Sequence, residues 1–358
     1  MAGAPQIGGA PAVVLQARDL PEAGPAFTEA TVLPGRGMML LQARLRLPSG
    51  EVVDALHAPP LDEAARELAG GADDFAGNRA FAFGGALLIP YANRIRGRDV
   101  QGEREIEALI DGRPARLPRN WGGKAPGAAQ YAMHGLILDA AVPFEAQESR
   151  VRGRLAAGDF GGRWPGKADL DFEYRLEGGA LVLRIDVRNV GAEPLPLGVG
   201  WHPYFQLPSG DRRQARLRVA ADLRTEVNDY DEVLPTGRLL PTEGTPYDFG
   251  AREGLALGDL YLDDCFTALR REAGEVVVEL RDPAASVGVR IRTSTPQVKA
   301  VQVYAPPGQP FVVVEPQFNL AEPYADIWPA GVDTGMAQLQ PGENLSYEVR
   351  LEAFAVGT

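Results

Sequence analysis

A strict two-residue alternation between residues 168 and 176 constrains the fold of this chain more than any other feature. Such alternation predicts a strand with one buried and one exposed face. Glu177-Gly178-Gly179-Ala180 then predicts a turn, and residues 181–188 alternate again, so the two segments are expected to form an antiparallel hairpin. In the first strand the apolar residues are Ala168, Leu170, Phe172, Tyr174 and Leu176, and the charged ones are Asp169, Asp171, Glu173 and Arg175.

Similar alternation of apolar and polar residues recurs along the chain. Residues 41–47, 215–219, 275–280 and 287–292 also predict strands, and 42 glycines and 30 prolines suit the many turns between them. One segment, residues 61–68, predicts a helix, with Asp62 and Glu63 in its first turn and Gly70-Gly71 after its end. Because helices do not separate the strands, the fold class is predicted to be all-β, a large antiparallel β-sandwich, and not a nucleotide-binding βαβ fold.

Composition and charge restrict the organisation and the partners. The 358 residues show no internal repeat and no linker-like run, which favours a single domain over residues 1–358 with an irregular N-terminal segment at 1–30. A net charge of −12 opposes binding to nucleic acid or to an anionic membrane, and no apolar stretch reaches the length of a membrane span. One cysteine, Cys265, excludes an intrachain disulfide. We therefore expect a cytoplasmic monomer or homodimer that binds a small neutral molecule.

The chain has three histidines, and two of them have informative neighbours. His57 has no polar residue beside it and is expected to be a surface or loop histidine. His134 lies in Tyr-Ala-Met-His-Gly, and His202 lies in Gly-Trp-His-Pro-Tyr-Phe. Either one alone is more often a core histidine. Together they suggest an aromatic pocket in which polar groups meet sugar hydroxyls and rings meet the apolar face of the sugar.

A glutamate follows the most apolar segment of the chain. Glu315 comes after Phe311-Val312-Val313-Val314 and before Pro316. Burial at this position raises a carboxyl pKa toward neutrality, which makes the residue a candidate general base, although a strand-end glutamate that reaches solvent fits the sequence equally well. Asp263 and the pair Asn93-Arg94 are further polar residues beside apolar ones at expected strand ends.

The order of these motifs resembles the aldose 1-epimerase family, from about residue 33 to residue 353. The motifs are Asn93-Arg94-Ile95, His134-Gly135, Trp164-Pro165-Gly166, His202-Pro203-Tyr204-Phe205, Asp263-x-x-Phe266, Glu315-Pro316-Gln317 and the closing Leu339-Gln340-Pro341-Gly342-Glu343. Gln206 and Pro316 depart from the residues that family members often have at these positions, and we expect such departures to affect substrate choice more than chemistry.

The resemblance implies an open sugar-binding cleft and a role for each matched residue. Glu315 would take the proton from the anomeric hydroxyl, and His202 would protonate the ring oxygen. Arg94, His134 and Asp263 would hold the sugar hydroxyls, with Asn93 in support. The implied enzyme is an isomerase, an aldose 1-epimerase that needs no cofactor and no metal.

Four alternatives stay open on the sequence. A metal site could use His134, His202, Asp263 or Glu315, but no metal-binding spacing is present. A glycosidase could use Glu315 and Asp263 as its carboxylate pair. A hexose-6-phosphate 1-epimerase would need an arginine cluster, for which Arg96 and Arg98 are available beside Arg94. A non-catalytic sugar-binding protein would lack the acid or the base. The Gly- and Ala-rich stretch 67–85 could be a lid, a partner surface or an insertion.

Overall fold

The hairpin predicted around Gly178 and Gly179 is present in a nine-stranded antiparallel sheet. In the computed structural model, which describes residues 5–123 and 127–357, Glu177 lies opposite Ala180. Gly178 and Gly179 have φ of 57° and 79°, as a two-residue hairpin turn requires. The strands run in the order β14 (Phe144–Gln147), β15 (Arg150–Gly158), β16 (Ala168–Glu177), β17 (Ala180–Asn189), β30 (Asn344–Ala355), β26 (Val287–Thr293), β25 (Val276–Asp282), β20 (Arg216–Val219) and β23 (Leu255–Ala256).

A second antiparallel sheet has eleven strands and carries the candidate site. Its order is β22 (Pro235–Pro241), β21 (Ala221–Val227), β24 (Leu262–Leu269), β27 (Ala300–Ala305), β28 (Phe311–Gln317), β19 (Gly200–Gln206), β7 (Gly85–Leu88), β5 (Met39–Arg46), β4 (Ala26–Leu33) and β3 (Val13–Gln16), and β6 (Val52–Asp54) also pairs with β5. Smaller sheets flank it, formed by β8 (Arg94–Arg96), β12 (Trp121–Gly122) and β13 (Gln130–Met133), by β9 (Arg98–Asp99), β10 (Glu105–Ile110) and β11 (Arg113–Pro118), by β1 (Gln6–Ile7) and β2 (Ala10–Pro11), and by β18 (Leu195–Leu197) and β29 (Ala337–Leu339).

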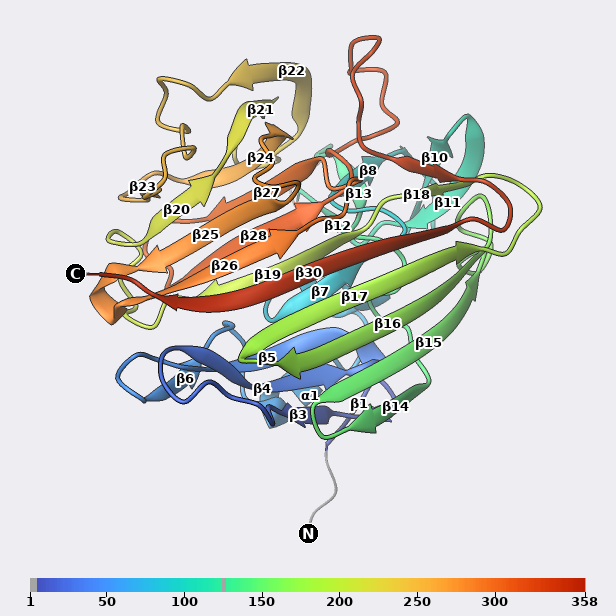
Figure 1. Ribbon diagram of the computed structural model, residues 1–358. Coiled ribbons are helices and arrows are strands. Elements are labelled where there is room, and N and C mark those ends of the chain that lie inside the picture. Colours follow the sequence, from blue (N-terminus) through green and yellow to red (C-terminus); the bar gives the residue numbers. More distant parts are fainter. Residues whose placement is uncertain (1–4, 124–126, 358) are drawn as a thin grey trace.

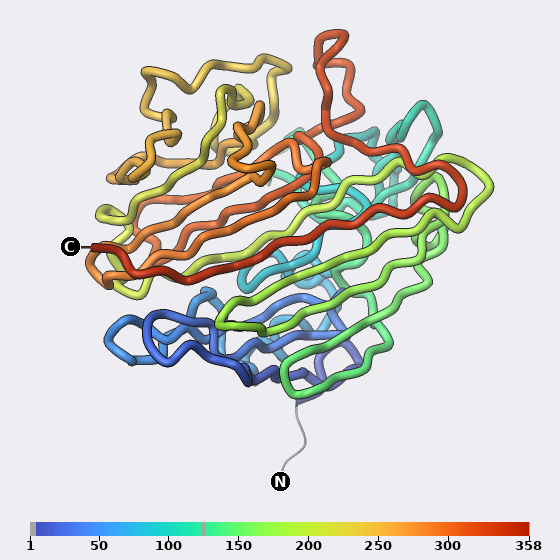
Figure 2. The backbone as a smooth tube through the Cα atoms, in the orientation of Figure 1, coloured from blue at the N-terminus to red at the C-terminus, as the bar shows by residue number. Residues whose placement is uncertain are grey.

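The two large sheets form the layers of a sandwich (Figure 1). Figure 2 shows β30, in red, crossing the front layer between β17 and β26. One hydrophobic cluster takes side chains from both sheets, among them Phe172 of β16 and Val312 of β28. Phe318, just after β28, meets Tyr347 of β30 edge-on, with 5.8 Å between ring centroids. The predicted all-β, antiparallel sandwich is confirmed, and its core lies between the two layers.

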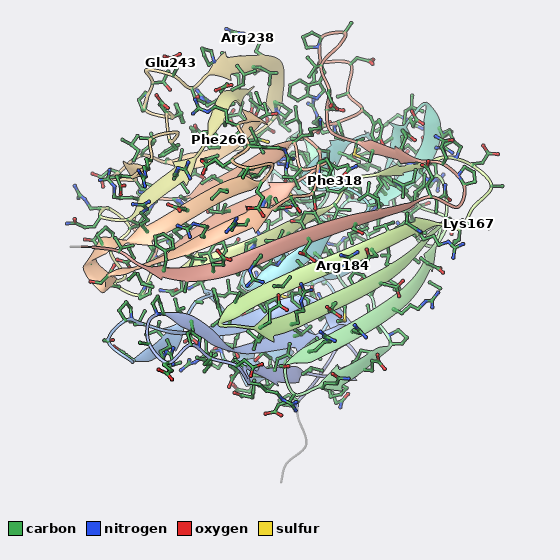
Figure 3. All side chains as sticks on the ribbon, viewed as in Figure 1. Lys167, Arg184, Arg238, Glu243, Phe266 and Phe318 are labelled. Carbon is green, nitrogen blue, oxygen red and sulfur yellow. The ribbon has the colours of Figure 1, made fainter. Side chains whose placement is uncertain are left out.

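Charged side chains cover the outer face of the nine-stranded sheet. Figure 3 labels Arg184 on this face, where its Nη2 lies 2.8 Å from Asp186 Oδ1, and Arg152 Nε lies 2.6 Å from Glu173 Oε2 on the neighbouring strands. Exposed pairs of this kind contribute about 0–1 kcal/mol each. The alternation seen in the sequence thus places apolar residues in the core and solvated charges outside.

The expectation that residues 1–30 are irregular is wrong for part of this segment, of which residues 1–4 lie outside the described residues. Val13–Gln16 and Ala26–Leu33 are β3 and β4, and they extend the eleven-stranded sheet at one edge. β4 is buried along most of its length, with the side chains of Phe27 and Ala30 fully enclosed. Its burial on both faces removed the alternation that identifies other strands.

Helix is scarce in the described residues. The predicted helix is present as α1 (Leu61–Glu67), and the 3₁₀ turns are η1 (Pro34–Arg36), η2 (Phe75–Phe81) and η3 (Pro283–Ala285). Within 5–123 and 127–357, no helix is both long enough and apolar enough to cross a membrane.

A buried ion pair holds the stretch 67–85 against η1, the turn between β4 and β5. Arg36 Nη1 and Nη2 each lie 2.9 Å from a carboxylate oxygen of Asp74, and both side chains are at most 3% exposed. Asp74 also accepts hydrogen bonds from the backbone N–H groups of Gly70 and Arg79. The stretch is therefore an ordered part of the fold, and it carries Phe81 to the candidate site.

We predict that Asp74→Ala destabilises the protein by about 3–5 kcal/mol, because it leaves the Arg36 guanidinium buried without its partner. Urea unfolding measures this change. Asp62→Ala is the matched control, since it removes an exposed pair with Arg66 and should cost about 0.5 kcal/mol or less. Equal losses in the two variants would contradict a structural role for the buried pair.

Candidate active site

Strand register in the eleven-stranded sheet aligns three polar side chains. Gln302 on β27 lies opposite Glu315 on β28. On the other side of β28, Tyr204 of β19 lies opposite Val313, and this register places His202 opposite Glu315. Residues opposite each other in an antiparallel pair point to the same face of the sheet. His202, Glu315 and Gln302 therefore form a row across three strands.

This row faces away from the core of the sandwich. Val312 and Val314 belong to the main hydrophobic cluster, whereas Val313 packs with Tyr204 in a separate cluster. Because side chains alternate along a strand, Glu315 shares the face of Val313. Other segments cover this face, so that Glu315 is only 2% exposed.

Two residues with left-handed backbone bring further polar groups over the row. Asn93 precedes β8 with φ of 58°, and His134 follows β13 with φ of 63°. The His134 N–H donates to the Asn93 carbonyl oxygen at 2.8 Å, which ties the two positions together. Positive φ is uncommon outside glycine and concentrates at functional sites. Here it places Arg94 and His134 beside the row.

Together these side chains enclose a cavity of about 280 Å³. Its charged and imidazole groups come from the predicted residues and from one loop, and its aromatic rings come from six segments of the chain. The lining residues are Phe81, Asn93, Arg94, Trp121, Met133, His134, His202, Tyr204, Tyr230, Asp231, Glu232, Val233, Tyr261, Asp263, Gln302, Tyr304 and Glu315.

Glu315 and His202 form a buried acid–base pair. His202 Nε2 lies 3.3 Å from Glu315 Oε1, and the side chains are 7% and 2% exposed. Burial raises the pKa of Glu315 well above its usual range, with a further increase from the nearby Asp263, and burial lowers the pKa of His202 to about 4. Both shifts favour the neutral forms, so one proton is held between the two side chains, mainly on Glu315.

His134 lies against this pair as a neutral imidazole. Its ring meets His202 edge-on at 4.7 Å between centroids and meets Phe81 at 4.9 Å. Burial lowers the pKa of His134 well below its usual value, and the positive charge of Arg94, or of His202 when it is protonated, lowers it further. A neutral imidazole both donates and accepts hydrogen bonds, which suits a contact with a hydroxyl group.

A chain of hydrogen bonds fixes Arg94 and Asp263. Arg94 Nε donates to Asn93 Oδ1 at 3.0 Å, and Asn93 Nδ2 donates to Gln302 Oε1 at 3.2 Å. Gln302 Nε2 then donates to Asp263 Oδ1 at 2.6 Å. Burial raises the pKa of Asp263 to about 6, although Arg94 and the bond from Gln302 oppose the rise. The cavity thus holds a fixed cation and a fixed acceptor.

Three of these side chains are types that bind transition metals. One ligand atom each from His134, His202 and Glu315 lies within 4.8 Å of the other two, and they form the one such group found in the described residues. A metal ion could be held only where the Glu315–His202 contact lies, and it would displace the shared proton.

All six residues that the sequence singled out, Asn93, Arg94, His134, His202, Asp263 and Glu315, line this cavity. His57 lies elsewhere, in a loop, where Nδ1 is 2.9 Å from Gln206 Oε1. Gln206 and Pro316 are not among the described residues that line the cavity, so their expected influence on substrate choice has no direct route here.

Several cavity residues were missed by the sequence analysis. Gln302 and Tyr304 had a signal, because they alternate with Val301 and Val303 and so place polar groups on one face of an apolar strand. Phe81 had none, since the stretch around it has no period and reaches the site through the Arg36–Asp74 pair.

Comparisons with known sequences identify the family to which the chain is similar. Residues 53–352 match the family model described as aldose 1-epimerase. Galactose mutarotase of Rattus norvegicus is 26% identical over 172 residues, which are 47% of each chain. Galactose mutarotase of Mus musculus is 27% identical over 180 residues, which are 49% of this chain and 46% of that one. The matched segments thus span about half the length of these relatives.

Solved structures share the fold over nearly the whole chain. An aldose epimerase homologue from C. elegans superimposes with a TM-score of 0.71 at 20% identity, covering 97% of this chain and 100% of the other. A galactose mutarotase-like protein from Clostridium acetobutylicum gives 0.70 at 20% identity, covering 93% and 94%. With the family model matching most of the sequence and this architecture around the cavity, the chain belongs to the aldose 1-epimerase family.

Proposed function

We propose that this protein interconverts the α and β anomers of a free aldose by opening and reclosing the sugar ring. The observation that carries the proposal is the 3.3 Å contact between His202 Nε2 and Glu315 Oε1 in a buried cavity. The reaction exchanges protons at two oxygens bonded to one carbon, so its acid and its base have to lie side by side.

In the proposed mechanism Glu315 takes the proton from the anomeric hydroxyl while His202 protonates the ring oxygen. The bond between the anomeric carbon and the ring oxygen breaks, and the former hydroxyl becomes the aldehyde oxygen. Rotation about the bond between the first and second carbons presents the other face of the aldehyde. The reverse proton transfers then close the ring to the second anomer, so protons and electrons balance without a cofactor.

The pair carries one exchangeable proton, which is the number that these steps need. Before ring opening the pair has to be carboxylate and imidazolium, and after it the pair is carboxylic acid and imidazole. The burial of Glu315 and His202 favours the second, neutral state. Burial therefore disfavours the charged pair that starts the reaction, and in this mechanism the hydroxyl groups of the bound sugar have to stabilise it.

The charges around the cavity favour an unphosphorylated sugar. Among the described residues that line it, Arg94 is the one cation, against four carboxyl groups that include Asp231 and Glu232. Arg96 pairs with Glu322 at 3.1 Å, and Arg98 pairs with Glu107. A phosphate dianion would thus meet net negative charge and no arginine cluster, which supports a free aldose over a hexose 6-phosphate.

We predict that Glu315→Gln and His202→Asn each lower kcat for anomer exchange by roughly 10²–10⁴-fold, because each removes one proton transfer. Magnetisation-transfer NMR on galactose, glucose, arabinose and glucose 6-phosphate measures the exchange, and quenching of Trp fluorescence reports sugar binding. His57→Asn, the third histidine, is the control and should exchange sugar at the wild-type rate. Hydrolysis of a methyl glycoside, whose anomeric oxygen is blocked, would instead indicate a glycosidase.

A second prediction concerns pH and Asp263, whose carboxyl pKa is raised to about 6 by burial. If the carboxylate accepts a sugar hydroxyl, kcat/KM rises with pH through about 6, and Asp263→Asn removes this rise. The folded state binds the proton more tightly than the unfolded state, so the carboxyl lowers stability as pH increases from about 4 to 6. Asp263→Asn should therefore raise Tm at pH 7.5 more than at pH 4, and a larger gain at pH 4 would contradict the assigned shift.

A further inference from the structure

A loop between β21 and β22 forms part of the cavity wall and contacts the cation of the site. Tyr230, Asp231, Glu232 and Val233 of this loop line the cavity. Arg94 Nη1 donates a hydrogen bond to the Glu232 carbonyl oxygen at 2.5 Å. The position of this loop, residues 228–234, therefore fixes one end of the Arg94 guanidinium.

The loop is braced by hydrogen bonds within it. Asp229 Oδ1 accepts from the backbone N–H groups of Asp231 at 3.0 Å and Glu232 at 2.8 Å, as in an Asx turn. Asn228 Oδ1 accepts from the Leu234 N–H at 2.8 Å and closes the base of the loop. These bonds do not attach the loop to the sheet, so the attachment depends on contacts between the loop and other segments.

One of these contacts is made by a buried carboxylate, Asp264, which follows Asp263 in the sequence. Tyr230 donates its hydroxyl proton to Asp264 Oδ2 at 2.9 Å. Arg224 Nη1 lies 2.9 Å from Asp264 Oδ1, and the Asp264 side chain has no exposed surface. The Arg224 guanidinium stacks on the Tyr247 ring at 3.8 Å, and the Tyr247 and Tyr230 hydroxyls are 3.2 Å apart.

A buried carboxylate is costly unless it is paired and hydrogen-bonded, and both conditions are met for Asp264. Its neighbour Asp263 faces the sugar cavity, whereas Asp264 contacts the loop. The proposed chemistry does not use Asp264, so its pairing calls for another role.

We propose that Asp264 and Tyr230 are positioning residues that hold the loop 228–234 over the cavity and thereby orient Arg94 toward the sugar. The effect on the reaction rests on the proposed function, in which Arg94 binds sugar hydroxyls. The tether itself does not rest on it. Loss of the tether should weaken sugar binding and leave the Glu315–His202 chemistry in place.

The test compares Tyr230→Phe, which removes one hydroxyl, and Asp264→Asn, which removes the charge, with the wild type. The control is Tyr174→Phe, a buried tyrosine on β16 whose hydroxyl has no partner in the described residues. The first readout is cleavage by a Glu- and Asp-specific protease at residues 229–232 under native conditions. The second is KM and kcat for anomer exchange, with Tm measured for every variant.

A hydrogen bond to a charged group stabilises a folded structure more than a bond between neutral groups does. Its loss should therefore speed protease cleavage of the loop and raise KM, each roughly ten-fold. The value of kcat should stay within about two-fold of wild type. Cleavage at the wild-type rate in both variants would overturn the tether. Faster cleavage with unchanged KM, or a loss confined to kcat, would overturn its role in orienting Arg94. If the wild type exchanges no sugar, the proposed function has failed, while protease cleavage still decides the tether.

Discussion

The site depends on the antiparallel register of β28 with its two neighbours. This register puts Glu315 between His202 and Gln302 on one face, and puts Val312 and Val314 into the core on the other. A slip of one residue would exchange the two faces, burying a carboxylate in the sandwich and exposing valine to the cavity. The packing of Val312 and Val314 in the core therefore fixes the register that also positions the Glu315 carboxylate. The interactions that stabilise the fold thus determine the geometry of the site.

Several polar atoms of the cavity lower the stability of the folded protein because they are buried without a hydrogen-bond partner in the part of the chain that the structure describes. His134 Nδ1, His202 Nδ1 and Glu315 Oε2 are buried and have no hydrogen-bond partner among the described residues. Each unsatisfied buried polar atom costs about 1–3 kcal/mol. A bound sugar can satisfy such atoms with its hydroxyls. The two large sheets and their common core supply the stability that tolerates these costs.

Much of the fold could be predicted because its strands are half-buried. The hairpin of β16 and β17 has one solvent-exposed face and one buried face, so polar and apolar residues alternate in its sequence. β4 is buried on both faces, so its sequence shows no such alternation and does not predict a strand. The six predicted site residues were recognised from the order of short motifs. The place of Phe81 and of the loop 228–234 in the cavity could not be predicted, because it depends on contacts between segments that are distant in the sequence.

The cavity has two structurally different halves. Glu315, His202 and Gln302 lie on central strands whose backbones are fixed by neighbours on both sides. Phe81 lies at the end of a 3₁₀ turn, and Tyr230 to Val233 lie in a connection between strands. Connections tolerate insertion and substitution far better than central strands do. Substitutions in these connections can therefore change the shape that the cavity offers to a ligand, while the strand backbones that carry Glu315, His202 and Gln302 stay in place.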